Sequence, residues 1–266
     1  MEARTATRPP LETPSAGVEH SSAPLTPTSD QIVALYVTIS MSVIIFGVWN
    51  VPGLRNLISP LKLFTIGLHE LCHVVVAVLT GGRILRMTID PHIGGATIVE
   101  GGYPKLILPA GYIGSTLVGG AFVLAGWDTL MAKIMSFFLA IGMLMPLRLV
   151  RDKMTILLTF MYEGLLIGFW FIDHGSALRW YCLFVGIMNI FYVIWDVADD
   201  RFFHKTNDSD TTQFELMYPS IRQHVWALLW IAFSVAWIIG FILIGIFAFK
   251  MTSEEMRKQA DTFLPT

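Results

Sequence analysis

Charged residues are scarce in this chain. Asp, Glu, Lys and Arg make up 14% of the 266 residues, whereas hydrophobic residues make up 54%. A soluble globular domain usually carries about 25% charged residues, so the shortage indicates a fold solvated mainly by lipid. The formal net charge is -2, and Lys and Arg are thinly spread. We therefore expect no basic surface of the kind that binds nucleic acid.

Cysteine is also rare. The sequence contains two cysteines, Cys72 and Cys182, and both lie within apolar stretches. Two such thiols give no disulfide framework, and in lipid-embedded helices they usually behave as small hydrophobic residues. Disulfide bonds are therefore not expected to hold this fold together.

Large apolar residues are few in residues 1–30, which are rich in Pro, Ser, Thr and Ala. No apolar segment follows Met1, so a cleaved signal peptide is not expected, and the composition predicts a disordered tail. The sequence is thereby divided into this tail, a membrane domain over residues 31–250 and a short polar C-terminal tail over residues 251–266.

Long apolar runs fill the membrane domain. A membrane-spanning helix needs about 20 mainly apolar residues, and the pattern predicts an all-α polytopic membrane protein with about seven transmembrane helices. Lys and Arg are slightly more frequent in the loops on the side of the N-terminus, which favours a cytosolic N-terminus. The predicted spans are residues 32–49, 61–79, 106–125, 132–149, 156–172, 178–197 and 225–249.

The segment between the second and third spans has a different pattern. Residues 83–90 are rich in β-formers, residues 91–95 are typical of a turn, and residues 96–100 resemble a second strand. This pattern predicts a short β-hairpin. Backbone at membrane depth must be buried or line a cavity, so we expect the hairpin at the membrane interface or covered by helices.

Small residues recur at four-residue intervals in the third predicted span, at Gly111, Ser115 and Gly119. Small residues on one face of a helix allow a neighbouring helix to approach closely. We interpret these positions as packing positions in preference to a direct role at a site.

The second predicted span contains the motif His69-Glu70-Leu71-Cys72-His73. Residues four apart share one face of a helix, so the two imidazoles can bind one zinc ion. Glu70 stands where a metalloprotease carries its general base. Ionisable residues at membrane depth are costly and indicate function. Two alternatives are a polar cluster that holds helices together and a histidine-ligated cofactor such as haem, which would leave Glu70 unexplained.

A catalytic zinc needs a third protein ligand, which must come from another helix. Asp196 ends an apolar run, and Asn189 lies seven residues earlier, on nearly the same face of a continuous helix. We expect Asp196 to complete a His-His-Asp site, with Asn189 as a polar neighbour of substrate or water. Asp199 or Asp200 are alternative ligands. The three aspartates are otherwise an acidic cluster that caps the helix.

Glu163 interrupts the fifth predicted span. An intramembrane carboxylate can relay protons or interact with a metal ligand without binding the metal itself. It can equally mark a helix boundary that differs from residues 156–172.

Several stretches resemble one family, the site-2-protease-type intramembrane zinc metallopeptidases of the B-like branch of metallopeptidase family fifty. The resemblance covers about residues 61–210. It rests on the run from His69 to Arg83, Gly94-Gly95-Ala-Thr97, Gly101-Gly102, the run from Pro109 to Ser115, Asn189 with Asp196, and Asn207-Asp-Ser-Asp210.

The resemblance implies a role for each matching site residue. His69, His73 and Asp196 are expected to bind Zn2+, and Glu70 is expected to be the catalytic base. Asp208 and Asp210 resemble a Ser-Asp element of the branch to which no role is assigned. The implied activity is that of a zinc metalloendopeptidase in the lipid bilayer, which hydrolyses peptide bonds in or near the transmembrane segments of protein substrates.

A second function is compatible with the same pattern. A catalytically silent membrane scaffold or chaperone would keep the fold and lose the base or a metal ligand. Here Glu70 and both histidines are present, which favours the enzyme.

Overall fold

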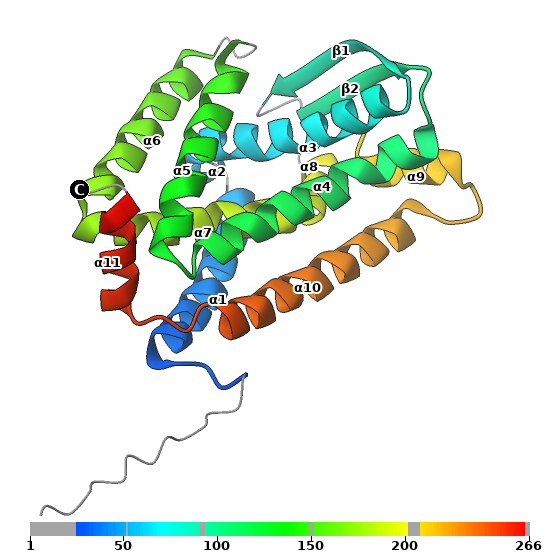
Figure 1. Cartoon of the computed structure of the whole chain (residues 1–266). Coiled ribbons are helices and arrows are strands. Elements are labelled where there is room, and N and C mark those ends of the chain that lie inside the picture. Colours follow the sequence, from blue (N-terminus) through cyan, green and yellow to red (C-terminus); the bar gives the residue numbers. More distant parts are fainter. Residues whose placement is uncertain (1–24, 52, 91–93, 149–151, 202–207, 264–266) are drawn as a thin grey trace, which may run out of the picture.

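Helices make up most of the structure (Figure 1). The computed structural model describes residues 25–51, 53–90, 94–148, 152–201 and 208–263, so most of the predicted disordered tail lies outside the described residues. The elements are α1 (Ser29–Asn50), α2 (Leu54–Leu57), α3 (Ser59–Leu79), β1 (Arg83–Asp90), β2 (Gly94–Glu100), α4 (Pro104–Ala125), α5 (Thr129–Leu144), α6 (Lys153–Phe171), α7 (Ser176–Ile190), α8 (Tyr192–Arg201), α9 (Asp210–Met217), α10 (Gln223–Ala248) and α11 (Ser253–Phe263), with short 3-10 helices η1 (Met145–Arg148) and η2 (Asp173–Gly175).

Six helices in the described part of the chain are long and apolar enough to cross a membrane: α1, α3, α4, α5 together with η1, α6, and α10. A seventh span results if α7 and α8 are taken together, although these two helices are bent by 57° relative to each other. The predicted fold class, a polytopic helical membrane protein with about seven spans, is confirmed.

The sixth predicted span is not one continuous helix. α7 ends at Ile190 and α8 begins at Tyr192. A break frees backbone groups that must find other partners, and here the indole nitrogen of Trp195 donates to the carbonyl oxygen of Met188 at 3.1 Å. Asn189 and Asp196 therefore belong to different helices and do not share a face.

α4 and α7 cross at the centre of the helical bundle. A Cβ at Gly186 would lie 2.6 Å from the backbone nitrogen of Val123 and 2.7 Å from the carbonyl oxygen of Gly119. A Cβ at Gly119 would lie 2.8 Å from the backbone nitrogen of Ile190. Gly119 thus has the packing role predicted for it, because two backbones meet there directly.

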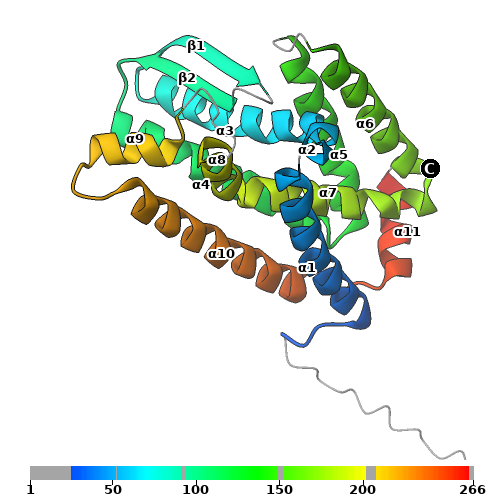
Figure 2. The same cartoon turned by 180° about the vertical axis from the view of Figure 1, so that it is seen from behind.

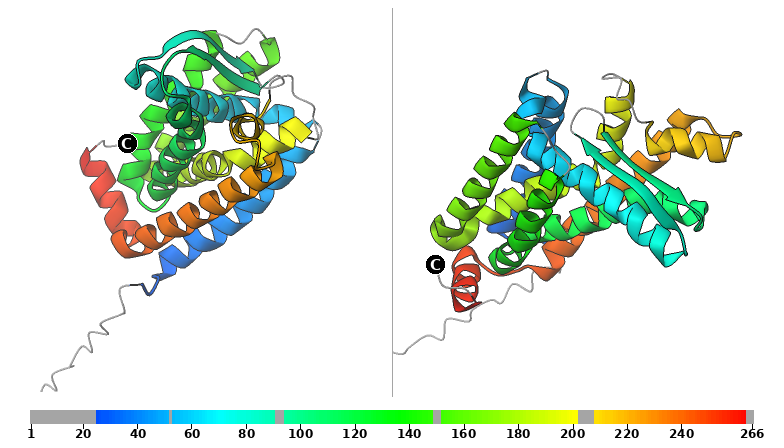
Figure 3. Two further views of the ribbon diagram at one scale, coloured as in Figure 1. Left: turned by 90° about the vertical axis from the view of Figure 1, so that its right-hand side faces the viewer. Right: turned by 90° about the horizontal axis from the view of Figure 1, so that it is seen from above.

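β1 and β2 form an antiparallel hairpin that lies along α3 (Figure 3). Arg83 pairs with Glu100 at one end and Asp90 with Gly94 at the other. The predicted hairpin is confirmed. Its place against α3 brings β2 next to the helix that carries the histidine motif.

A buried ionic cluster joins the end of α8 to α1, α2 and α3. Figure 2 shows these four helices from behind. The Asp199 carboxylate accepts hydrogen bonds from Lys62 at 3.1 Å, Arg55 at 3.0 Å and the indole of Trp49 at 3.1 Å. The Lys62 ammonium also lies 4.6 Å from the ring centroid of Trp49. These contacts tie α8 to the start of the motif helix.

The predicted polar C-terminal tail contains a helix, α11. Met256 and Ala260 on α11 are buried, and the helix contacts α5 and η2. The ammonium of Lys133 on α5 lies 3.5 Å from the Ala260 carbonyl oxygen. The apolar residues are therefore gathered on one face of an otherwise polar segment.

Candidate metal centre

α3 places His69 and His73 one turn apart on a buried face. Pro60 lies in the first turn of the helix, where its missing N–H costs no hydrogen bond. The two histidine rings have centroids 4.7 Å apart, and their Nε2 atoms are separated by 3.1 Å. The predicted pair of imidazoles thus converges on one point.

The orientation of His73 is fixed from the opposite side of its ring. Its Nδ1–H donates to the backbone carbonyl oxygen of Ile107 at 2.8 Å. This hydrogen bond leaves Nε2 as the nitrogen that faces His69. Metal-binding histidines commonly have their second nitrogen held in this way.

Asp210, the first residue of α9, is the acidic group beside the histidines. Its Oδ2 lies 2.9 Å from Nε2 of His69 and 3.1 Å from Nε2 of His73. Burial raises the pKa of Asp210, but the adjacent His73 and His69 lower it by more. The pKa of Asp210 therefore lies well below its usual value, and the residue is a carboxylate at neutral pH.

These three residues form a group that can hold a metal ion. Two histidine nitrogens and one carboxylate oxygen are a ligand set found in catalytic zinc sites. With bonds of about 2.0–2.1 Å to each ligand, a tetrahedral zinc would set the ligand atoms about 3.3 Å apart. The separations in the structure are shorter by a few tenths of an ångström, so a small outward movement accommodates the ion.

Glu70 lies beside this group and is only 5% exposed. The Thr97 hydroxyl on β2 donates to its Oε2 at 2.7 Å. Gly95, also on β2, leaves the space that Glu70 occupies, since a Cβ there would collide with Oε1. The hairpin therefore sets the position of the predicted base.

Gly111 on α4 has a similar spatial role for the histidines. A Cβ at this position would collide with Nε2 of His73 and of His69. Gly111 therefore has a packing role, as predicted, because its missing side chain leaves room for the rings of His69 and His73.

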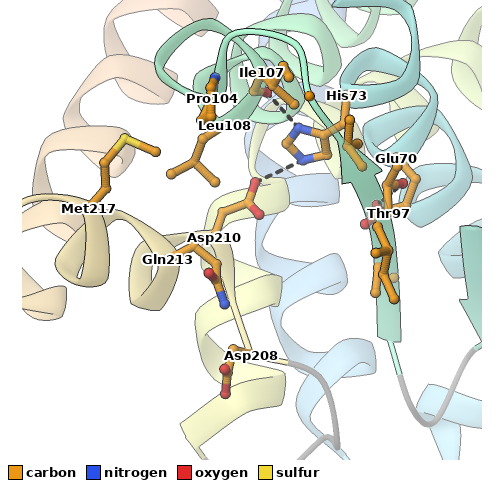
Figure 4. A pocket seen from close by; sticks show the side chains of 15 residues that line it. Glu70, His73, Thr97, Pro104, Ile107, Leu108, Asp208, Asp210, Gln213 and Met217 are labelled. Carbon is orange, nitrogen blue, oxygen red and sulfur yellow. Dashed lines mark hydrogen bonds and ion pairs between the residues drawn. The ribbon is translucent and has the colours of Figure 1, made fainter. Parts of the chain in front are cut away.

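A cavity of about 630 Å³ opens onto the centre (Figure 4). Glu70 and His73 line it from α3, and Asp210 lines it from the start of α9. Its other described walls are formed by β2, Gly101 after it, the first turns of α4, Asp208 and the rest of α9. The remaining lining residues are Gly95, Ala96, Thr97, Ile98, Val99, Gly101, Pro104, Ile107, Leu108, Asp208, Gln213 and Met217.

Asp196, the predicted third ligand, is not in the group of described residues that could hold a metal ion. Its Oδ2 instead accepts a hydrogen bond from the Tyr112 hydroxyl at 2.6 Å and one from the backbone N–H of Asp210 at 3.2 Å. The bend between α7 and α8 removes the helical face on which the prediction depended. We therefore replace Asp196 by Asp210 in the candidate set.

The other predicted polar residues lie elsewhere. Asp199 is engaged in the ionic cluster, and the side chain of Asp200 is outside the described part. Asn189 is fully buried and donates to the Val185 carbonyl oxygen of its own helix at 2.8 Å. Glu163 is on α6, with a buried Oε1 that has no described partner. Neither Asn189 nor Glu163 is among the described residues that line the cavity.

One comparison with known proteins gives a match. A family model described as Peptidase M50B-like matches residues 38–241, a range that contains both histidines, Glu70 and Asp210. No curated protein and no solved structure matches the chain. Since the matched range covers most of the sequence and nearly all the apolar helices, the chain belongs to the Peptidase M50B-like family.

Proposed function

We propose that this protein is a membrane-embedded zinc metalloendopeptidase that hydrolyses peptide bonds in or near transmembrane segments. The observation that carries the proposal is the convergence of His69, His73 and Asp210 on one point, with Glu70 beside them and a cavity in front. Membership of a peptidase family and the apolar helices are consistent with this proposal.

The three ligands would be His69 and His73 through Nε2 and Asp210 through Oδ2. When bound there, zinc supplies a Lewis acid that activates water and polarises the peptide carbonyl. Three protein ligands leave a coordination position open, as catalysis requires. Because the carboxylate lowers the net charge of the dication, the site suits a largely buried environment.

Glu70 would act as the general base. Its carboxylate takes a proton from the attacking water and returns it to the leaving amine. The Thr97 hydroxyl holds Oε2 at 2.7 Å, which leaves Oε1 as the oxygen available to water. Gly95 bounds the space around Oε1 on the hairpin side.

The substrate would be a transmembrane protein that offers an extended stretch of backbone. β2 pairs with β1 along one edge in a sheet of two described strands, and five consecutive residues of β2 line the cavity, Gly95, Ala96, Thr97, Ile98 and Val99. An extended peptide can add to the outer edge of a small sheet through main-chain hydrogen bonds. Addition along β2 would bring its carbonyl groups past Glu70.

The test is a paired measurement of zinc content and cleavage on purified protein. We expect wild type to hold one zinc, Glu70→Gln to keep zinc and lose cleavage of a reconstituted transmembrane substrate, and His69→Ala to lose both. His224→Ala is the matched control, because His224 is exposed at the start of α10.

Two results would contradict the proposal in different ways. If purified wild type holds no zinc, the proposed metal centre is wrong. Zinc-loaded wild type that cleaves no more substrate than Glu70→Gln would instead favour the silent scaffold.

A further inference from the structure

Asp196 joins three helices at one carboxylate oxygen. Its Oδ2 on α8 accepts from the hydroxyl of Tyr112 on α4 at 2.6 Å and from the backbone N–H of Asp210 on α9 at 3.2 Å. Asp196 is 6% exposed and Tyr112 is 2% exposed. Polar groups buried this deeply need hydrogen-bond partners, and here the partners belong to segments that carry or contact the metal centre.

We propose that Asp196 is a positioning residue, which holds Asp210 and Tyr112 in place for metal binding without being a ligand itself. The inference rests on the metal site proposed above. It adds a residue that contacts one ligand and a neighbour of another but not the metal ion. Asp196 would hold the ligand Asp210 through its backbone N–H, and the ligand His69 through the ring of Tyr112.

The effect on Asp210 follows from its place in α9. Asp210 is the first residue of this helix, and the N-cap residue Ser209 makes no side-chain capping hydrogen bond. The first N–H groups of a helix lack partners within the helix. Asp196 supplies an acceptor for the N–H of Asp210 and so fixes the backbone from which the ligating carboxylate extends.

The effect on His69 passes through Tyr112. Nδ1 of His69 is buried and has no hydrogen-bond partner in the described part of the chain. The His69 ring is instead packed between two tyrosines, with centroid distances of 5.2 Å to Tyr112 and 4.2 Å to Tyr192. Because Asp196 anchors the Tyr112 hydroxyl, it also holds one of the two rings that orient His69.

The test is zinc affinity, measured by competition with a chelator and therefore independent of catalysis. Asp196→Asn keeps an oxygen that can accept from Tyr112 and from the N–H of Asp210, whereas Asp196→Ala removes this acceptor. Loss of an outer partner typically weakens metal binding about 10- to 100-fold. We expect that loss for Asp196→Ala and a change of less than about tenfold for Asp196→Asn.

Two further variants complete the series. Asp210→Asn should abolish stoichiometric zinc binding, because it removes a ligand. Tyr112→Phe should weaken binding by roughly tenfold, at the low end of the range for outer partners, because the hydrogen bond from the backbone N–H of Asp210 to Asp196 remains. This variant keeps the aromatic ring, so it tests the inference even if Asp196→Ala fails to fold.

The outcomes separate the alternatives. If Asp196→Asn loses zinc as completely as Asp210→Asn, Asp196 is a ligand and the inference is overturned. If Asp196→Ala folds and binds zinc like wild type, or Tyr112→Phe does, the positioning role is also overturned. If wild type binds no zinc, the proposed metal site itself is wrong. This result is distinguishable because it is obtained before any variant is measured.

Discussion

At the scale of single residues, the site depends on contacts between side chains that are distant in the sequence. Thr97 on β2 holds Glu70, and the Ile107 carbonyl on α4 holds His73. A candidate metal site at His69 and His73, with Glu70 beside it, could be predicted because their spacing places them together on a helix. Thr97 and Ile107 were not predictable as partners, since their contacts depend on how the hairpin and α4 fold back on α3.

Thr97 gives a prediction at this scale. Thr97→Val keeps the shape of the side chain and removes the hydrogen bond to the Glu70 carboxylate. Hydrogen bonds to charged groups contribute about 1.5–3 kcal/mol, so we expect kcat to fall roughly 10- to 100-fold, with zinc content unchanged. Thr97→Ser should restore most of the rate. Equal rates for the Val and Ser variants, measured on one transmembrane substrate, would show that the hydroxyl does not position the base.

The sequence places Asp210 in a stretch that resembles the family, but it assigns no role to this residue. It lies outside every predicted span, at the start of a helix of eight residues. A search for ligands at the ends of apolar runs leads to Asp196 instead. The signal that would have found Asp210 is the resemblance in Asn207-Asp-Ser-Asp210, of which it is the last residue.

At the scale of elements, apolar length and turn residues were sufficient to predict the spans and the hairpin. They were not sufficient to predict the break between α7 and α8, because the residues around Phe191 are as apolar as those of an unbroken helix. The break is stabilised by Trp195, whose indole reaches the Met188 carbonyl. This contact is specific to the folded state and has no counterpart in a hydropathy pattern.

The crossing of α4 and α7 gives a prediction for these elements. Gly186→Ala would place a Cβ 2.6 Å from the Val123 backbone nitrogen, and backbone cannot move aside as a flexible side chain can. Overpacking typically costs about 1–3 kcal/mol, so we expect a lower midpoint of thermal unfolding in detergent. Gly240→Ala on α10 is the matched control, because a Cβ there meets nothing within 4 Å. An unchanged midpoint for Gly186→Ala would mean that the helices separate at little cost.

At the scale of the whole molecule, the metal centre connects parts of the chain that are far apart in sequence. His69 and Asp210 are separated by 141 positions and belong to α3 and α9. A ligand that binds only the folded state stabilises it by mass action. The proposed ion would therefore act as a structural link between the motif helix and the segment that follows α8.

Metal removal tests this link. At zinc concentrations 100 times the dissociation constant, binding adds about 2.7 kcal/mol to the free energy of unfolding. We expect a membrane-permeable chelator to lower the midpoint of thermal unfolding of wild type and to leave that of Asp210→Asn unchanged. A chelator effect of equal size on both proteins would place the stabilising metal somewhere other than the proposed centre.

The position of Asp210 late in the chain has a consequence for biosynthesis. Ribosomes add about 5–20 residues per second, so His73 is made roughly 7 to 27 s before Asp210. Through that interval the growing chain holds the two histidines and Glu70 but lacks the last ligand. A nascent chain would therefore enter the membrane with the proposed centre incomplete, and the proposed peptidase activity would arise only after most of the helices have been synthesised.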